Sequence, residues 1–217
     1  MQINYPKKIL DIIQGLKYNI DSIGRSEDVV ITFEKKYVLK ISNNINMLKR
    51  EYDINEILYG VIPSSKNILF IVEDDKSYYL RAYLDGYSLI DSKYINNPEL
   101  LIEALVKTVE ILRGLNKYDF SNYLSNESIG NSFIHGDLCL PNIYFDEDNK
   151  FIGFIDLGGA GLGDEWSDYA WMLWSLEYNL KTNEYNSVLL NKLNIKFDEK
   201  KYNKYIPLEN RKMLNKE

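Results

Sequence analysis

His135-Gly136-Asp137-Leu138-Cys139-Leu140-Pro141-Asn142 is the stretch that decides the fold, because it places a carboxylate and an amide five residues apart in a loop between apolar runs. Thirteen residues separate Asn142 from a second carboxylate, Asp156, in Ile155-Asp156-Leu157-Gly158. The strand-like run over residues 151–155 leads directly into that aspartate. Two carboxylates and one amide are therefore expected to come together at the end of a short hairpin.

This combination of side chains meets the needs of phosphoryl transfer. One carboxylate must orient an attacking hydroxyl and accept its proton, and further oxygen ligands must hold magnesium on the nucleotide phosphates. The spacing from Asp137 to Asn142, followed by an aspartate after a hairpin, is the spacing of kinase catalytic loops. Each residue alone is equally well explained by an ordinary turn, so the prediction depends on the combination.

The first part of the chain, residues 1–84, is expected to form a small mixed unit. Apolar residues at helical spacing predict helices over residues 8–16 and 45–59. Runs rich in β-branched and aromatic residues predict two hairpins, over residues 29–41 and 68–83. The expected order is helix, hairpin, helix, hairpin, which gives an antiparallel sheet accompanied by one key helix.

The second part, residues 85–217, is expected to be mainly helical. A helical stripe runs through residues 98–113, starting with proline and glutamate, which are tolerated at a helix start. Further helices are predicted over residues 166–178, 184–193 and 198–205. The fold class is therefore α+β, with a sheet-containing first lobe and a helical second lobe.

The first lobe contains the two charged residues that a kinase needs there, a lysine on the third strand and a glutamate on the next helix. Lys40 is the one basic residue of the apolar run Val38-Leu39-Lys40-Ile41, and Glu51 lies inside the following predicted helix. We expect these two side chains to form an ion pair, with Glu56 as the alternative partner. The competing interpretation is that each simply faces solvent.

Residues 133–176 resemble the aminoglycoside phosphotransferase family, particularly the 3′-phosphotransferases, whose signature is a His-Gly-Asp loop followed by Ile-Asp-Leu-Gly. The resemblance extends more weakly over most of the chain. It implies a bilobal protein-kinase-like fold, ATP or GTP as phosphate donor, and magnesium as cofactor. It also implies that Asp137 is the catalytic base and that Asn142 and Asp156 hold the metal.

The resemblance extends these roles to the rest of the nucleotide site. Residues 1–84 would bind the nucleotide, with a hinge over residues 79–84 whose backbone groups at Ala82 and Leu84 contact adenine. Residues 23–27 would form the phosphate loop, with one glycine where protein kinases have three. The remaining residues, 85–217, would carry catalysis and bind the acceptor.

The single histidine of the chain, His135, is expected to support the loop and not to activate a nucleophile. Cys139 lies too close to it in sequence to be the usual partner of a catalytic histidine, and the chain has no Gly-x-Ser-x-Gly motif, so nucleophilic hydrolysis is disfavoured. By resemblance, Asp168 braces the catalytic loop from the start of a helix. One cysteine and one histidine also exclude an internal disulfide and a structural zinc site.

The acceptor is less well defined, because the family's long helical insertion before the His-Gly-Asp strand is replaced by the short connection over residues 115–131. The C-terminal segment over residues 207–212 also lacks the family's acidic and apolar end. Four carboxylates remain that could meet a cationic acceptor: Asp164, Glu165, Glu177 and Glu184. The competing and favoured interpretation is that all four lie on solvated helix faces. The acceptor is thus an aminoglycoside or related amino sugar, or another metabolite such as choline, a thiosugar, homoserine or a macrolide. A third alternative is a nucleotide-binding protein without turnover.

Composition excludes some partners. The net charge of −6, from 26 basic and 32 acidic residues, has the wrong sign for nucleic acid but suits a cationic small molecule. No run approaches the length of about 18 uncharged apolar residues that a membrane span needs, and the first residues lack a signal peptide's apolar stretch. We therefore expect a cytoplasmic protein with no membrane partner, and the sequence leaves its oligomeric state open.

Overall fold

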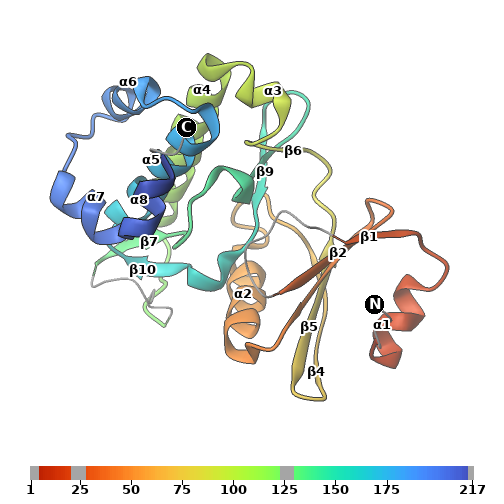
Figure 1. The fold of residues 1–217 in the computed structure, drawn as a ribbon. Coiled ribbons are helices and arrows are strands. Elements are labelled where there is room, and N and C mark those ends of the chain that lie inside the picture. Colours follow the sequence, from red (N-terminus) through yellow and green to blue (C-terminus); the bar gives the residue numbers. More distant parts are fainter. Residues whose placement is uncertain (1–4, 21–27, 123–129, 215–217) are drawn as a thin grey trace. The chain divides into compact units, whose positions relative to one another are not determined.

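The computed structural model describes residues 5–20, 28–122 and 130–214, and its chain divides into two compact units (Figure 1). Unit 1 is Met1–Asp85 and unit 2 is Gly86–Glu217. The expected phosphate loop over residues 23–27 lies outside the described residues. No helix among the described residues combines the length and the apolar character that crossing a lipid bilayer requires.

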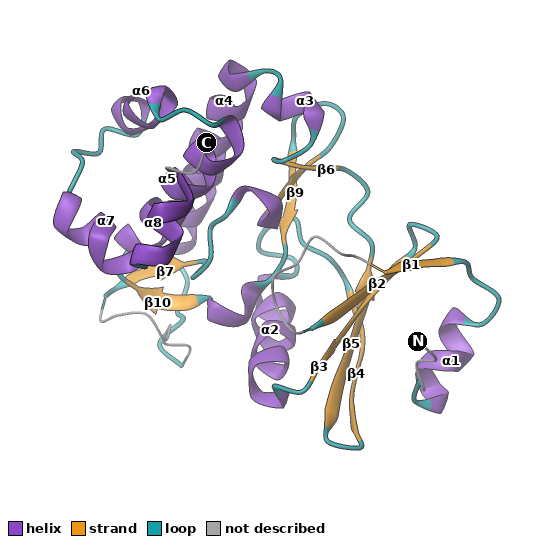
Figure 2. Ribbon diagram, viewed as in Figure 1, coloured by secondary structure: helices purple, strands orange, loops and turns teal. Residues whose placement is uncertain are grey.

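Unit 1 is built on a five-stranded antiparallel sheet in the order β1-β2-β3-β5-β4 (Figure 2). The strands are β1 Tyr18–Ile20, β2 Val29–Phe33, β3 Tyr37–Ser42, β4 Asn67–Glu73 and β5 Lys76–Ala82. Two helices accompany the sheet, α1 Lys7–Ile13 and α2 Ile45–Leu58. Both hairpins turn through residues with positive φ. Asp74 and Asp75 form a two-residue turn between Glu73 and Lys76, where positive φ is required. Glu34 and Lys35 begin a three-residue loop between Phe33 and Tyr37.

The two faces of this sheet pack against different helices because side chains alternate along each strand. Leu39 and Leu80 are fully buried in a core shared with Ile9 of α1. The next residues along the strands, Lys40 and Tyr79, stand opposite each other on the other face, which α2 covers. Alternation along β3 therefore directs Lys40 toward α2.

Unit 2 is mainly helical. Its helices are α3 Ser92–Ile95, α4 Pro98–Leu115, α5 Trp166–Leu180, α6 Glu184–Lys192, α7 Glu199–Tyr205 and α8 Leu208–Leu214, with short 3-10 turns at Leu140–Asn142 and Leu157–Gly159. Its strands are β6 Tyr87–Ser88, β7 Ser132–Ile134, β8 Ile143–Phe145, β9 Phe151–Phe154 and β10 Gly161–Gly163. They form a three-stranded sheet, β6-β8-β9, and a separate pair, β10-β7.

These small sheets position the two signature loops. Strand β7 leads into His135 and pairs antiparallel with β10, so that Ile134 stands opposite Gly161. The β8–β9 hairpin returns the chain from Asn142 to Asp156, and the Ile155 N–H donates to the Asn142 carbonyl at 3.0 Å. Helices α4 and α5 are rich in buried residues and supply the core beneath the loops.

The expected helices at 45–59, 98–113 and 166–178 are present as α2, α4 and α5, with ends within two residues of the prediction. The first helix is shorter than expected, since it ends at Ile13, just before Gly15 with a φ of 80°. Five short elements were not predicted: α3, α8, β1, β6 and β10. The mixed α+β class with an antiparallel sheet followed by a helical region is confirmed.

Candidate active site

The His-Gly-Asp loop is braced by Asp168, in the first turn of α5. Its Oδ2 accepts a hydrogen bond from the His135 N–H at 2.7 Å, and its Oδ1 accepts one from the Gly136 N–H at 2.9 Å. The Asp168 side chain is only 2% exposed, so these charge-assisted bonds are shielded from water. One carboxylate thus fixes two consecutive peptide groups just before Asp137, as the sequence predicts.

His135 is fully buried and uses both ring nitrogens. Its Nε2 lies 3.0 Å from the Ile155 carbonyl, which can only accept a hydrogen bond, and its Nδ1 accepts from the Asp137 N–H at 3.3 Å. Both contacts together require the neutral imidazole with its proton on Nε2. Burial lowers the pKa of His135, although the negative charges of Asp137 and Asp156 act to raise it. The ring therefore links the two signature loops as a structural support, in agreement with its expected role.

The two loops also meet through glycine backbones. Gly136 has a φ of 83°, in the left-handed region that favours glycine. A Cβ built on Gly136 would collide with the carbonyl group of Gly159, and a Cβ on Gly159 would lie 3.4 Å from the Gly136 Cα. The loops approach each other this closely because Gly136 carries no side chain, whereas a Cβ at Gly159 would make an ordinary contact.

Asn142 and Asp137 are brought into direct contact. The Asn142 Nδ2 group donates to the carbonyl oxygen and to the Oδ2 atom of Asp137, both at 3.0 Å. Asn142 is buried while Asp137 is half-buried, and the Leu140 N–H between them is held by the Ser175 hydroxyl of α5 at 3.0 Å. With its nitrogen directed to Asp137, the Asn142 amide retains its oxygen for another ligand.

Asp156 follows strand β9 with a φ of 61° and a ψ of 47°, a left-handed conformation uncommon for residues other than glycine. The carboxylates of Asp137 and Asp156 both act on the pKa of His135, so the two acids lie around the same buried ring. Among the residues that the structure describes, no group of three or more His, Cys, Asp or Glu side chains forms a metal cluster. The oxygens of Asn142 and Asp156 fit magnesium, which takes one or two protein ligands and completes its coordination with phosphates and water.

Cys139 lies inside the same loop, but its thiol is poorly suited to nucleophilic chemistry. Its side chain is buried, and its Sγ atom lies 4.0 Å from the Trp171 carbonyl. Burial, reinforced by the neighbouring Asp137 carboxylate, raises the pKa of the Cys139 thiol well above its usual value. A thiol in this state is a poor nucleophile, which agrees with the prediction against hydrolysis.

In unit 1 the predicted ion pair is present. The Lys40 Nζ atom lies 2.9 Å from Glu51 Oε2, and the two side chains are only 15% and 7% exposed. The alternative partner, Glu56, instead accepts a hydrogen bond from Asn67 Nδ2 at 2.7 Å. The structure adds a carboxylate that sequence reasoning missed, because Asp28 Oδ2 lies 3.5 Å from the same ammonium group.

The predicted hinge residues lie at the end of unit 1. The Ala82 N–H donates to the Lys66 carbonyl at 2.8 Å, and the Ala82 carbonyl accepts a hydrogen bond from the Ser65 hydroxyl. Leu84 is buried, with 8% of its surface exposed. The backbone groups of Ala82 are thus already used within unit 1.

Asp164, the first of the four expected acceptor carboxylates, is engaged with α7. It accepts hydrogen bonds from Lys201 Nζ at 3.2 Å and from the Tyr205 hydroxyl at 3.0 Å. It also accepts from the Trp166 N–H at 3.1 Å, at the start of α5. This carboxylate therefore fastens α7 to α5.

Two more of the four are engaged as well. Glu165 accepts a hydrogen bond from the Tyr169 hydroxyl at 2.7 Å, and Glu177 accepts one from Asn186 Nδ2 at 3.1 Å. Burial raises the pKa of Glu177. Only Glu184, at the first position of α6, is exposed to solvent.

The connection that precedes the His-Gly-Asp strand is short. Helix α4 ends at Leu115 and β7 begins at Ser132. Among the described residues of this connection, 116–122 and 130–131, there is no helix. The described part of the chain therefore holds no counterpart of the helical insertion.

Comparison with known proteins agrees with this geometry. A family model described as "Phosphotransferase enzyme family" matches residues 127–192, which contain both signature loops. An aminoglycoside 3′-phosphotransferase from Niallia circulans is 37% identical, and the match covers 95% of this chain and 97% of the relative. That alignment runs over 255 residues, more than the 217 of this chain, so the relative contains segments that this chain lacks. A second aminoglycoside 3′-phosphotransferase, from Enterococcus faecalis, is 40% identical over 75% of this chain and 78% of its own length.

Solved structures show the same fold at low sequence identity. An aminoglycoside phosphotransferase from Streptomyces rimosus, solved in complex with ADP and streptomycin, superimposes with a TM-score of 0.71 at 16% identity, over 96% of both chains. An aminoglycoside 3′-phosphotransferase of type VIII gives a TM-score of 0.72 at 16% identity, over 96% of each chain. The chain therefore belongs to the aminoglycoside phosphotransferase family of kinase-type enzymes.

Proposed function

We propose that this enzyme transfers the γ-phosphate of ATP or GTP to a hydroxyl of an aminoglycoside or a related amino sugar. The observation that carries the proposal is the Asp137–Asn142 contact at 3.0 Å, inside a loop held by the buried Asp168 carboxylate. Relatives named aminoglycoside 3′-phosphotransferase support the acceptor class. Family members solved with ADP and streptomycin, or with GDP and kanamycin, support the pairing of nucleotide and amino sugar.

Asp137 is the base in this proposal. Its Oδ2 accepts a hydrogen bond from Asn142, which fixes the orientation of the carboxylate. The carboxylate would orient the acceptor hydroxyl and take its proton as the hydroxyl oxygen attacks the γ-phosphorus and the nucleoside diphosphate leaves. Because Asp137 is half-buried, its carboxylate is reachable by a small molecule.

Asn142 and Asp156 are proposed to hold magnesium, through the amide oxygen of the first and the carboxylate of the second. The bound ion would neutralise charge on the nucleotide phosphates. The hydrogen bonds from Asn142 Nδ2 to Asp137 direct the amide oxygen away from the base. The same residue thus connects the base to the metal site.

Unit 1 is proposed to bind the nucleotide, and residues 85–217 to carry catalysis and bind the acceptor. Lys40, paired with Glu51 at 2.9 Å, would contact the phosphates. The backbone of the hinge would contact adenine. Since the Ala82 N–H already donates to Lys66, this contact is assigned chiefly to Leu84.

The proposal also covers the charge of the acceptor and the cellular location of the enzyme. The net charge of −6 favours a cationic acceptor and disfavours nucleic acid. A cytoplasmic enzyme has access to ATP and GTP, and phosphorylation of an aminoglycoside in the cytoplasm would give resistance to that antibiotic.

A phosphate-transfer assay tests the proposal. Purified enzyme is given ATP or GTP, with or without magnesium, and kanamycin or neomycin as acceptor. We expect magnesium-dependent transfer, and we expect Asp137→Asn to lower kcat about 10² to 10⁴-fold with little change in nucleotide affinity. The matched control is Asp148→Asn, an exposed aspartate of unit 2 whose side chain is 76% accessible. Absence of transfer to any amino sugar would refute the acceptor assignment.

A second candidate keeps the chemistry and changes the acceptor to choline, a thiosugar, homoserine or a macrolide. The short connection and the engagement of Asp164, Glu165 and Glu177 favour it, because these features leave fewer carboxylates for a polycation. Expression in a susceptible host separates the two candidates. Kanamycin or neomycin tolerance that disappears in Asp137→Asn supports the amino sugar, and unchanged susceptibility supports the metabolite. Thermal stabilisation by nucleotide without turnover on any acceptor would indicate a binding protein instead.

A further inference from the structure

Lys40 contacts two carboxylates within unit 1, and one of them is unexpected. Its Nζ atom lies 2.9 Å from Glu51 Oε2 and 3.5 Å from Asp28 Oδ2. The Lys40 side chain is 15% exposed and that of Asp28 is 22% exposed, so water screens this second contact only in part. A single ammonium group thus neutralises at most one of the two acids beside it.

Asp28 immediately precedes strand β2, which begins at Val29. In the β2–β3 register Val30 stands opposite Lys40, and Asp28 precedes Val30 by two residues. Residues two apart on a strand face the same side, so Asp28 lies diagonally across from Lys40. The contact is therefore favoured by the pairing of β2 with β3, which places Asp28 close to Lys40.

We propose that Asp28 competes with the nucleotide phosphates for Lys40 and thereby makes nucleotide affinity depend on bound magnesium. This inference rests on the proposed function, in which Lys40 contacts those phosphates. Phosphate oxygens and the Asp28 carboxylate carry the same sign of charge and would approach the same ammonium group. Nucleotide binding must then weaken the Lys40–Asp28 pair, whereas Glu51, only 7% exposed on α2, stays in place.

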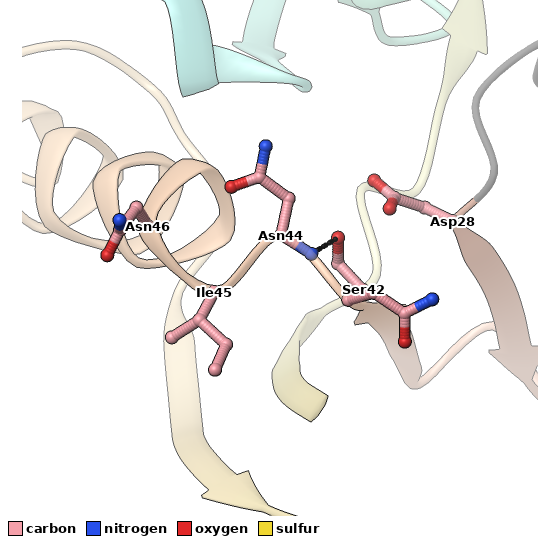
Figure 3. Close-up of a pocket in the computed structure, with 6 residues that line it drawn as sticks. Asp28, Ser42, Asn44, Ile45 and Asn46 are labelled. Atoms are coloured by element: carbon pink, nitrogen blue, oxygen red, sulfur yellow. Dashed lines mark hydrogen bonds between the residues drawn. The ribbon is translucent and has the colours of Figure 1, made fainter. Parts of the chain in front are cut away.

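Asp28 has space to release Lys40. It lines a cavity of about 660 Å³ together with Ser42, Asn43, Asn44, Ile45 and Asn46. In Figure 3 its carboxylate extends toward the space between it and Asn44. The opposite wall is fixed, since the Asn44 N–H donates to the Ser42 hydroxyl at 3.0 Å. A carboxylate at this position has room to turn into this space, which is lined mainly by polar residues, when the ammonium moves to a phosphate.

The charge on the nucleotide determines how strongly Asp28 opposes it. Coulomb repulsion scales with the product of the charges, and metal-free ATP carries more negative charge than its magnesium complex. Asp28 therefore penalises the metal-free nucleotide more than the complex. The consequence is selectivity for the form of ATP that can react.

Nucleotide affinity measured by calorimetry tests the inference. ATP is titrated into the wild-type chain and into Asp28→Asn, once with magnesium and once with a chelator. We expect Asp28→Asn to bind metal-free ATP about 5-fold more tightly and the magnesium complex at most about 2-fold more tightly. The matched control is Asp53→Asn, which removes an equal charge from the exposed Lys49–Asp53 pair on α2 and should leave both affinities unchanged.

The possible outcomes are distinct. Equal effects on the two forms of ATP, or weaker binding by Asp28→Asn, would overturn the inference. A lower kcat at unchanged affinity would also overturn it, because Asp28 would then hold Lys40 in its productive position. If the wild-type chain binds ATP under neither condition, the proposed function fails and the inference with it. Asp28→Ser, checked for folding by its melting temperature, repeats the measurement with a smaller side chain.

Discussion

Gly136 and Gly159 bring the backbones of the two signature loops together, so that a Cβ added at Gly136 would collide with the Gly159 carbonyl oxygen. The approach joins the loop that carries Asp137 to the loop that carries Asp156. The separation of Asp137 from Asp156 is therefore set in part by the absence of a side chain at Gly136.

Gly136→Ala is expected to destabilise unit 2 by about 2 to 4 kcal/mol, because alanine at a φ of 83° is strained and its Cβ meets the Gly159 backbone. Urea unfolding followed by circular dichroism measures the change. Gly114→Ala is the control, since Gly114 lies within α4 with no atom within 4 Å of an added Cβ, and alanine should stabilise that helix by up to about 1 kcal/mol. Equal effects of the two substitutions would contradict the close approach of the loops.

Asp168→Asn is expected to cost about 2 to 4 kcal/mol and to lower kcat strongly. The amide nitrogen would face either the His135 N–H or the Gly136 N–H, and one buried donor would lose its partner. Asp198→Asn is the control, because Asp198 caps α7 through a bond from the Lys201 N–H, and asparagine caps helices equally well. Thermal melts and transfer rates of both variants are compared. Wild-type activity in Asp168→Asn would show that the loop needs no such brace.

His135 is expected to stay neutral in the folded protein at pH values below 6.5, its ordinary pKa, because burial lowers its pKa. Below that pH the unfolded chain binds a proton that the folded chain does not, so this contribution to stability is complete above about pH 6.5 and declines as the pH falls toward the lowered pKa. Proton–nitrogen NMR of the imidazole reports its state directly, since the chain has one histidine. We expect the tautomer protonated on Nε2 and no titration near pH 6.5.

The same NMR experiment on urea-unfolded protein is the control, and its histidine should titrate near pH 6.5. A folded-state imidazole that titrates at that pH, or that carries its proton on Nδ1, would contradict the two hydrogen bonds assigned to the ring.

Glu51→Gln is expected to raise the KM for ATP about tenfold, equivalent to about 1.4 kcal/mol, because Lys40 loses its closer partner and stays beside Asp28. Glu56→Gln is the control on the same helix, since Glu56 contacts Asn67 and not Lys40. The KM for ATP of the two variants is measured by steady-state kinetics. A KM that rises equally in both would mean that general damage to α2, and not the ion pair, causes the effect.

Elements with strong local signals could be predicted from the sequence. Helix α4 combines a continuous apolar stripe with proline in its first turn and the cap Asn97, whose Oδ1 accepts from the Leu100 N–H at 3.2 Å. Strand β10 could not be predicted, because Gly161-Leu162-Gly163 has little strand propensity and becomes a strand only by pairing with β7. Helix α8 buries none of its residues, so it lacks the apolar stripe that reveals a helix.

In the candidate site too, contacts fixed by local sequence patterns could be predicted and contacts that depend on tertiary structure could not. The Lys40–Glu51 pair could be predicted because a strand pattern and a helix pattern fix both positions locally. Asp28 was missed because its relation to Lys40 depends on the register of β2 against β3, which no local pattern specifies. The engagement of Asp164 by Lys201 was missed for a similar reason, since 37 residues separate them and only tertiary packing brings them together.

Cys139 has a practical consequence for experiments on this enzyme. It is the only cysteine of the chain, and burial together with a raised pKa makes its thiol slow to react with maleimides at neutral pH. A cysteine introduced on the surface, such as Lys150→Cys at a side chain that is 75% accessible, would react far faster. The wild-type chain is therefore a natural background for site-directed labelling, in which a fluorophore or spin label reports from its chosen position alone.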